Sequence, residues 1–506
     1  MTRSLPIRNI LPASATGPAL SILAGAALPL LATFLIVERH WTALALMGGL
    51  GALLGLLVIQ PRYALLIVFA FLPFQALLND VFAGSIPAIA GCKDVLMAVV
   101  VSTFFVRYLR RRWYVNTALY LFLGFAVVSA IYVPFAPDWL RAVLQLRGLI
   151  LYPLITLIVA NVIETPQDLR RILRLVAIVG TVAVVYGIAQ YLTMFDVPYR
   201  NAGGNVMQRM GRFDGFGVVS TFADRPGFGG YLIPLFLLLF QVKLWPSTKA
   251  MWALRWLALS AIAVCLVLTY SRTIWIAMLV GMFVIIFLRD KMKAALGALA
   301  LCACLLIVYQ ARSLFLSSSL EEAATSDGSF LIRLNYWPRV FGYGAAHPLG
   351  IGLGTVGGPH LFESRAQTDD YGNLSYDQHA SFDSTGGLGA DNMLMVTDNS
   401  YLKLLIQGGF PLPFVFLWLI ASVLKLAYHT LGNIHIPRRD SRDSPDLWMR
   451  DVAIWASASF AALLTIFMFV DFMESVPSIS VYWLAAGALC CVRKMAQARA
   501  AGGMKR

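Results

Sequence analysis

The sequence predicts an all-α, polytopic integral membrane protein with about 14 transmembrane helices and one large outward-facing loop near 311–399. Of its 506 residues, 59% are hydrophobic and only 13% are charged, and the mean hydropathy is +0.73. These values exclude an ordinary soluble domain. Apolar stretches of about 16 to 25 residues recur, each long enough to cross a bilayer as a helix. They lack the alternating polarity of barrel strands, so a membrane β-barrel is excluded.

The expected spans follow from these stretches in chain order. They cover residues 18–37, 42–59, 63–79, 93–107, 116–133, 148–163, 173–194, 228–243, 256–270, 274–288, 294–310, 400–426, 452–473 and 478–492. The first is expected to be a retained helix, because it is too long for a signal-peptide core and no small-residue cleavage site follows it. The six cysteines lie within or at the edge of these spans, so neither a disulfide framework nor a metal site is expected.

The basic residues predict the orientation of the chain. Arginine and lysine clusters recur in alternate connections and in the C-terminal tail, so the positive-inside rule places these faces and both termini in the cytoplasm. This arrangement puts about 26 of the 40 Lys and Arg residues inside, against about 7 of the 26 Asp and Glu residues. The net charge of +14 therefore reflects topology, and nucleic acid is not an expected partner.

The outer face is rich in arginine. Its basic residues are nearly all arginine, with Lys93 and Lys403 as the two lysines. The planar guanidinium suits bidentate recognition of phosphate or carboxylate, although these arginines could instead pair with the outer acids. Arg272 lies in a short turn between two apolar spans, where a charge is costly unless it meets a partner or a wet cavity.

Two long outer loops, 195–227 and 311–399, carry the motifs. In the first, Arg212 lies among glycines, and Arg225 directly precedes a predicted helix, where backbone N–H groups favour an anion. The alternative is a simple connecting loop. The second loop holds Arg333 and Arg339 in an amphipathic or re-entrant helix, followed by a glycine-rich turn at 347–354. Long ordered loops of this kind are usually functional.

The second loop ends at Asp398, where the next span begins. Its carboxylate is either an N-cap or a general base held at the membrane surface. Asn399 and Tyr401 follow it into the helix. His360 and His379 lie in the polar stretch before it, and their spacing fits no recognised metal site.

Four of these segments together resemble the O-antigen ligase and polymerase family of polytopic membrane glycosyltransferases. They are residues 221–226 (Thr-Phe-Ala-Asp-Arg-Pro), 268–273 (Leu-Thr-Tyr-Ser-Arg-Thr), 347–354 (His-Pro-Leu-Gly-Ile-Gly-Leu-Gly) and 398–402 (Asp-Asn-Ser-Tyr-Leu), with Gly409 beyond. The resemblance is most specific over residues 221–412. Elsewhere it rests only on the many-span architecture.

The resemblance implies a metal-independent, inverting glycosyltransferase without a cofactor. It would act on glycans linked to undecaprenyl diphosphate at the periplasmic face of the bacterial inner membrane. Arg272 would match a diphosphate-contacting arginine of the family, and Arg333 or Arg339 a second one. The ligases carry histidine where this chain has Asp398. We therefore expect Asp398 as the base and Arg272 as the catalytic cation, with Arg212, Arg225, Asn399 and Tyr401 also in the substrate site.

The departure at Asp398 favours a polymerase of O-antigen, capsule or exopolysaccharide over a ligase that transfers glycan to lipid A core. The expected partners are the lipid-linked donor, a glycan or lipid acceptor, membrane lipids, and polysaccharide export and chain-length proteins. Two rival classes remain: a lipid-linked oligosaccharide flippase, and a non-catalytic assembly scaffold. Few acidic residues lie deep in the spans and no internal repeat is evident, which argues against ion-coupled transport.

The expected organisation has three parts. Residues 1–194 form N-terminal transmembrane helices, and residues 195–426 form the catalytic region with both long loops. Residues 427–506 form a cytoplasmic loop and the last helices.

Overall fold

A computed structural model describes most of the chain from residue 61 onward. It covers residues 61–82, 89–108, 113–137, 139–193, 217–222, 224–246, 248–289, 337–338, 340–355, 367–368, 374–375, 399–434, 444–470, 472–473 and 475–503. Three of the fourteen expected spans, 18–37, 42–59 and 294–310, lie outside these residues.

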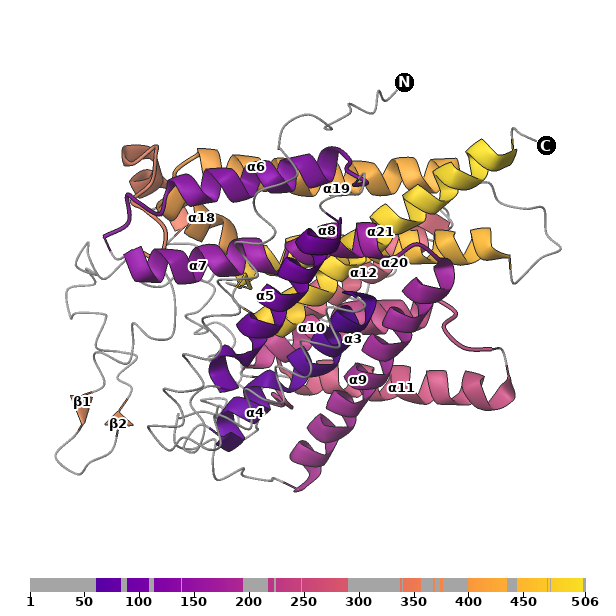
Figure 1. Ribbon diagram of the computed structural model, residues 1–506. Coiled ribbons are helices and arrows are strands. Elements are labelled where there is room, and N and C mark those ends of the chain that lie inside the picture. The colour runs from indigo at the N-terminus through magenta and orange to yellow at the C-terminus, as the bar shows by residue number, and fades with distance from the viewer. Residues whose placement is uncertain are drawn as a thin grey trace, which may run out of the picture.

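The described residues form a helical bundle, with one short antiparallel pair of strands (Figure 1). The elements are α3 (Pro61–Phe71), η1 (Leu72–Phe74), α4 (Gln75–Phe82), α5 (Ile89–Tyr108), α6 (Thr117–Ile131), α7 (Trp139–Leu151), α8 (Leu154–Val162), α9 (Pro166–Thr193), α10 (Arg225–Gln241), α11 (Lys249–Leu268), α12 (Arg272–Arg289), β1 (Gln367–Thr368), β2 (Leu374–Ser375), α18 (Ser400–Gly408), α19 (Pro411–Asn433), α20 (Pro445–Phe469) and α21 (Val476–Gly503). In the strand pair, Gln367 lies opposite Ser375.

Seven helical segments within the described residues are long and apolar enough to cross a membrane. They are Trp139–Val162 (α7 with α8), Pro166–Thr193, Lys249–Leu268, Arg272–Arg289, Pro411–Gly432, Pro445–Phe469 and Val476–Arg499. Shorter apolar helices cover Arg62–Leu78 and Thr117–Ile131. The described part of the chain is therefore almost entirely helical, as predicted, and seven of its helical segments can cross a membrane.

Three expected spans are interrupted where proline or glycine changes the backbone. Pro73 lies in the 3-10 turn η1 that interrupts the span expected at 63–79, and Pro153 lies between α7 and α8. The span expected at 400–426 breaks at Gly409, whose φ is 57°, with Pro411 starting the next helix. Proline cannot donate its backbone hydrogen bond, and a left-handed φ favours glycine. The segments around Pro73 and Pro153 still run on as the helical stretches Arg62–Leu78 and Trp139–Val162. The single span expected at 400–426 was wrong, because the membrane-crossing helix begins only at Pro411.

The core lies around α20 and α21, which cross the middle of the bundle (Figure 1). The protein buries 72% of the apolar window of α20 and 89% of that of α21, but only 28% for α11 and 22% for α12. The last two helices therefore present most of their apolar surface outward, as expected of helices that face lipid.

A proline within α10 is accommodated by two long-range hydrogen bonds. Pro234 has no N–H, so the carbonyl of Gly230 loses its helical donor. The Tyr482 hydroxyl donates to that carbonyl instead, at 2.9 Å, and the Trp455 indole donates to the Pro234 carbonyl, also at 2.9 Å. These bonds fix the middle of α10 to α20 and α21.

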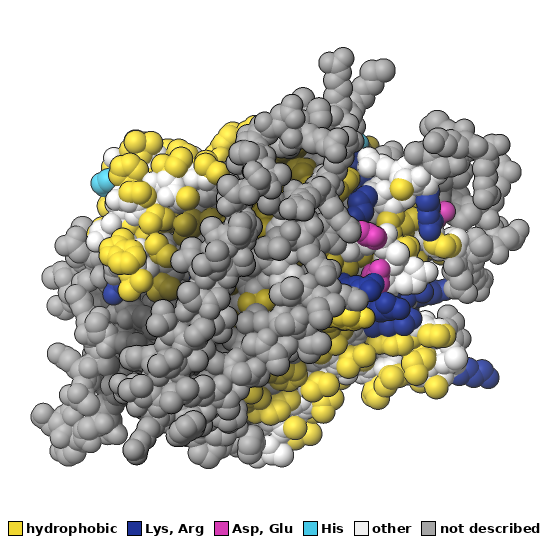
Figure 2. Space-filling model, viewed as in Figure 1, with side chains coloured by type: hydrophobic (Ala, Val, Ile, Leu, Met, Phe, Trp, Pro, Cys, Tyr) yellow, Lys and Arg dark blue, Asp and Glu magenta, His cyan; other side chains and the backbone are white. Residues whose placement is uncertain are grey.

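Basic side chains gather at one end of the bundle, called the basic end below (Figure 2). Several of them donate to carbonyls beyond or at the ends of helices, where a cation also complements the helix dipole. Arg174 donates to Leu244 O at 2.6 Å, and Lys494 to Ala160 O at 2.8 Å. Arg289 lies 3.5 Å from Asp451. The described members of the predicted basic clusters therefore meet at one end, while its assignment to the cytoplasm stays a prediction.

Candidate functional site

Four of the eight predicted site residues lie in the described part of the chain: Arg225, Arg272, Asn399 and Tyr401. All four lie at the end of the bundle opposite the basic end, called the opposite end below. Arg212, Arg333, Arg339 and Asp398 lie outside the described residues, as do His360 and His379. The four described residues lie at three helix starts, those of α10, α12 and α18.

The start of α10 is a capped helix end that carries Arg225. The Asp224 carboxylate accepts from Gly227 N and so acts as the N-cap. Gly217 lies against the Arg225 side chain, and a β-carbon at Gly217 would be 2.3 Å from Arg225 Cδ. Burial lowers the pKa of Arg225, and the neighbouring Asp224 opposes that shift. A guanidinium remains charged in such a setting, so a cation is held in place at this helix start.

The start of α12 is set by a strained junction with the loop before α10. Tyr270 has φ 50° and Ser220 has φ 55°, a left-handed conformation that is uncommon for residues other than glycine. Val218 N donates to Leu268 O at 2.9 Å, and Ser220 N donates to Gln190 of α9 at 2.9 Å. Surrounding contacts therefore hold this junction, which positions Arg272 as the first residue of α12. Strain of this kind clusters at functional sites.

The starts of α10 and α12 pack directly on each other. Gly229 faces Ile274, and a β-carbon at Gly229 would lie 2.8 Å from Ile274 Cγ2. The contact is one helical turn from Arg225 and two residues from Arg272. The two arginine-bearing helix starts therefore lie at the same level of the bundle.

The start of α18 is capped by Asn399. Its side chain accepts from Tyr401 N at 2.9 Å and Leu402 N at 3.2 Å, and donates to Met468 O at 2.9 Å. The Tyr401 hydroxyl donates to Leu464 O at 3.4 Å. The N-cap is thus Asn399, whereas the sequence had offered Asp398 for that role. A contact of Asn399 or Tyr401 with substrate stays a prediction.

The segment after α20 connects α18 to α10. Ser400 Oγ donates to Val470 O at 3.1 Å and accepts from Phe472 N at 3.2 Å. The Phe472 ring packs against Gly230, and the Ser478 hydroxyl donates to Gly227 O. The sequence analysis did not identify this connector, although serines beside a proline are typical of the start of a helix. This segment joins the start of α18 to the start of α10, which in turn packs on α12. The three helix starts therefore lie together at the opposite end.

The glycine-rich turn at 347–354 docks on the break between α18 and α19. Gly352 N donates to Gln407 O, and Phe410 N donates to Pro348 O, each at 3.0 Å. The φ values of Gly350, Gly352 and Gly354 are 76°, 102° and 77°. A β-carbon at Gly350 would lie 2.4 Å from Gly409 N. Both the conformation and the close backbone approach therefore require glycine.

Two glutamines fix this turn to α7. Gln145 Nε2 lies 2.7 Å from Gln407 Oε1, and Gln407 Nε2 lies 2.9 Å from Gln145 Oε1. Gly354 N also donates to Gln145 Oε1 at 2.7 Å. The sequence reasoning named neither residue as important, because a lone glutamine carries no signal of its partner 262 residues away.

An ion pair between α5 and α7 shows an outer arginine that pairs with an acidic residue, which was the alternative to phosphate binding. Arg147 NH1 lies 2.7 Å from Asp94 Oδ2, and the Tyr152 hydroxyl donates to Asp94 Oδ1 at 3.3 Å. Lys93, one of the two predicted outer lysines, neighbours this pair, which we interpret as structural.

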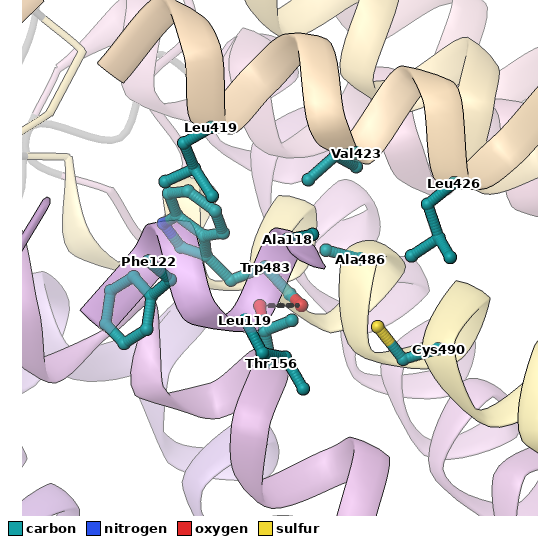
Figure 3. A pocket seen from close by; sticks show the side chains of 10 residues that line it. All are labelled: Ala118, Leu119, Phe122, Thr156, Leu419, Val423, Leu426, Trp483, Ala486 and Cys490. Atoms are coloured by element: carbon teal, nitrogen blue, oxygen red, sulfur yellow. Dashed lines mark hydrogen bonds between the residues drawn. The ribbon is translucent and has the colours of Figure 1, made fainter. Parts of the chain in front are cut away.

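A small apolar cavity between α6, α8, α19 and α21 is too small for substrate (Figure 3). Its volume is about 10 Å³, which corresponds to about one water molecule. Within it, Thr156 Oγ1 donates to Trp483 O at 3.0 Å, closing the α8–α21 contact. The cavity is therefore part of the packed core.

The bundle and its apolar helices define a multi-pass helical membrane protein. Residues 257–417 match the family model for O-antigen ligase, which supports the O-antigen ligase and polymerase family for this chain. The matched region contains the C-terminal part of α11 together with α12, the glycine-rich turn and α18, and Arg225 lies outside it. No curated protein matches the chain. The match supports a membrane enzyme of the glycosyltransferase type that acts on lipid-linked glycans.

Proposed function

We propose that the protein polymerises undecaprenyl-diphosphate-linked oligosaccharide repeat units into O-antigen, capsule or exopolysaccharide. The observation that carries this proposal is the packing of two arginine-bearing helix starts, at Arg225 and Arg272, at the opposite end of the bundle. Guanidinium groups beside helix N-termini favour a diphosphate, because backbone N–H groups and the helix dipole add to the positive charge.

The proposed reaction needs few groups from the protein. A hydroxyl of the acceptor glycan attacks the anomeric carbon of the donor, a carbon–oxygen bond forms, and the bond to the diphosphate oxygen breaks with inversion. Asp398, which precedes the Asn399 cap in the sequence, takes the hydroxyl proton as general base. Arg225 and Arg272 stabilise the charge that develops on the departing diphosphate. Arg212, Arg333 and Arg339 are proposed further contacts of the lipid-linked substrate.

The opposite end is proposed to face the periplasm of a bacterium, with the basic end and both termini in the cytoplasm. In that orientation the protein crosses the inner membrane about fourteen times, with a large periplasmic loop near 311–399. Residues 195–426 then form the catalytic region between two sets of transmembrane helices. The donor's polyprenyl tail would lie along the bundle in the bilayer, which keeps its diphosphate at the membrane surface.

Transfer of the glycan to lipid A core is the second candidate, because the matched family model is described as O-antigen ligase. Asp398 in place of the histidine of the resembling ligases favours polymerisation.

Incubation of the purified protein with lipid-linked repeat units from the native host separates the two candidates. A ladder of longer lipid-linked products supports the polymerase. Transfer only to added core lipid would establish the ligase instead. The absence of product with either acceptor would contradict both.

A further inference from the structure

A hollow of about 510 Å³ opens at the basic end, between the end of α10 and the start of α11. Its wall includes three basic residues, Lys243, Lys249 and Arg255, and two tryptophans, Trp245 and Trp252. None of the described residues that line it is acidic. The hollow lies at the basic end, whereas the proposed glycan site lies at the opposite end, so that site does not account for the hollow.

The charges around the hollow favour an anion. Arg255 donates from Nε to Leu239 O and from NH2 to Phe240 O, which fixes its side chain against the end of α10. Lys243 and Lys249 are exposed. Lys249 is the first residue of α11, and the first turn of that helix holds no acid. A helix N-terminus carries partial positive charge. The lysines beside this helix start add to its positive charge, which favours an anion in the hollow.

The surface beside the hollow exposes large apolar side chains, as expected of a surface that contacts lipid. Along α11, Trp252 is 64% exposed, Trp256 is 47% exposed and Leu257 is 67% exposed. The rings of Trp252 and Trp256 lie 6.1 Å apart. Tryptophan concentrates where hydrocarbon meets the headgroup layer, so these rings place the mouth of the hollow at that depth.

We propose that this hollow binds the headgroup phosphate of an anionic phospholipid. Lys243 and Lys249 contact the phosphate, and the acyl chains lie along the exposed face of α11. Basic pockets beside transmembrane helices bind acidic headgroups in this way. A free phosphate ion would use the lysines but leave the neighbouring apolar face without an occupant, so the lipid fits the surface better.

The test uses the full chain, purified and delipidated, and measures bound lipid by native mass spectrometry. Phosphatidylglycerol and phosphatidylethanolamine are the two probes. We expect the wild type to retain phosphatidylglycerol preferentially, and K243Q/K249Q to bind it about 30-fold more weakly, since each lysine near an anionic headgroup contributes about 1 kcal/mol. The control R171Q/R499Q also removes two charges at the basic end, and should bind like the wild type.

Two further measurements make the result decisive. The variant K243R/K249R keeps both charges and should retain the preference, which separates a loss of charge from a loss of folding. Inorganic phosphate in large excess should leave the bound lipid in place. Equal retention of the two phospholipids, equal loss in R171Q/R499Q, or displacement by inorganic phosphate would each overturn the proposal.

Discussion

Gly229 of α10 lies directly against Ile274 of α12, at the point where the two arginine-bearing helix starts come together. A β-carbon at Gly229 would approach Ile274 Cγ2 to 2.8 Å and Cγ1 to 2.9 Å. Ile274 is fully buried, so it has little room to move. The spacing of Arg225 and Arg272 therefore depends on the absence of a side chain at Gly229.

The first prediction concerns this contact. Gly229→Ala should push α10 and α12 apart, lower the free energy of unfolding by about 1–3 kcal/mol, and reduce glycan polymerisation. Gly124→Ala on α6 is the matched control, because nothing lies within 4 Å of the added β-carbon. Thermal unfolding and product formation should both separate the two variants. Equal stability and activity would show that the contact does not set the site.

A second prediction tests how α10 tolerates its proline. Tyr482→Phe removes the hydroxyl that donates to Gly230 O and leaves a buried carbonyl without that donor, at a cost of about 1–3 kcal/mol. Tyr428→Phe, at a side chain that is 76% exposed, should cost far less. Pro234→Ala restores the backbone donor, so Tyr482→Phe should cost less in that background. Strict additivity in this double-mutant cycle would refute the explanation.

The third prediction concerns the glycine-rich turn. Gly352→Ala should displace the turn, because Gly352 has φ 102° and its β-carbon would lie 2.7 Å from Ala136 Cα. We expect faster hydrogen exchange over residues 347–355 and a large loss of activity. Gly342→Ala, in the preceding helical segment 340–346, meets nothing within 4 Å and should be neutral. Normal activity in Gly352→Ala would remove the turn from the site.

Asp398→Asn tests the proposed general base. This variant should bind lipid-linked donor normally but form product about 10²–10⁴-fold more slowly, the usual contribution of a positioned base. Asp168→Asn, at the basic end where Asp168 pairs with Arg171, removes the same charge far from the site. An Asp398→Asn protein with wild-type turnover would exclude this carboxylate as the base.

The sequence predicted those features that depend on local composition. Hydropathy located most of the helices that the structure describes, and the arginine and lysine pattern grouped basic residues whose described members lie at one end. The break at Gly409 was missed because it depends on a distant segment: a β-carbon there would lie 2.0 Å from Pro348 O. The bond from Ser478 to Gly227 O likewise joins residues 251 apart, which no local pattern reveals.

Part of the candidate site was also within reach of sequence reasoning. Arg225 and Arg272 were singled out because each stands at the edge of an apolar span, and the structure places both at helix starts on one end. Asp398 was considered either as an N-cap or as a general base, and the structure gives the cap to Asn399. Either of two adjacent polar residues can cap a helix, and only the backbone geometry identifies Asn399.

Binding of undecaprenyl diphosphate to the purified protein tests the central claim most directly. Arg272→Ala and Arg225→Ala should each insert stably and bind this lipid about 10-fold or more weakly, because each removes a charge-assisted hydrogen bond to the diphosphate. Arg171→Ala, at the basic end, should bind like the wild type. Unchanged affinity in both Arg225→Ala and Arg272→Ala would contradict a diphosphate site at the starts of α10 and α12.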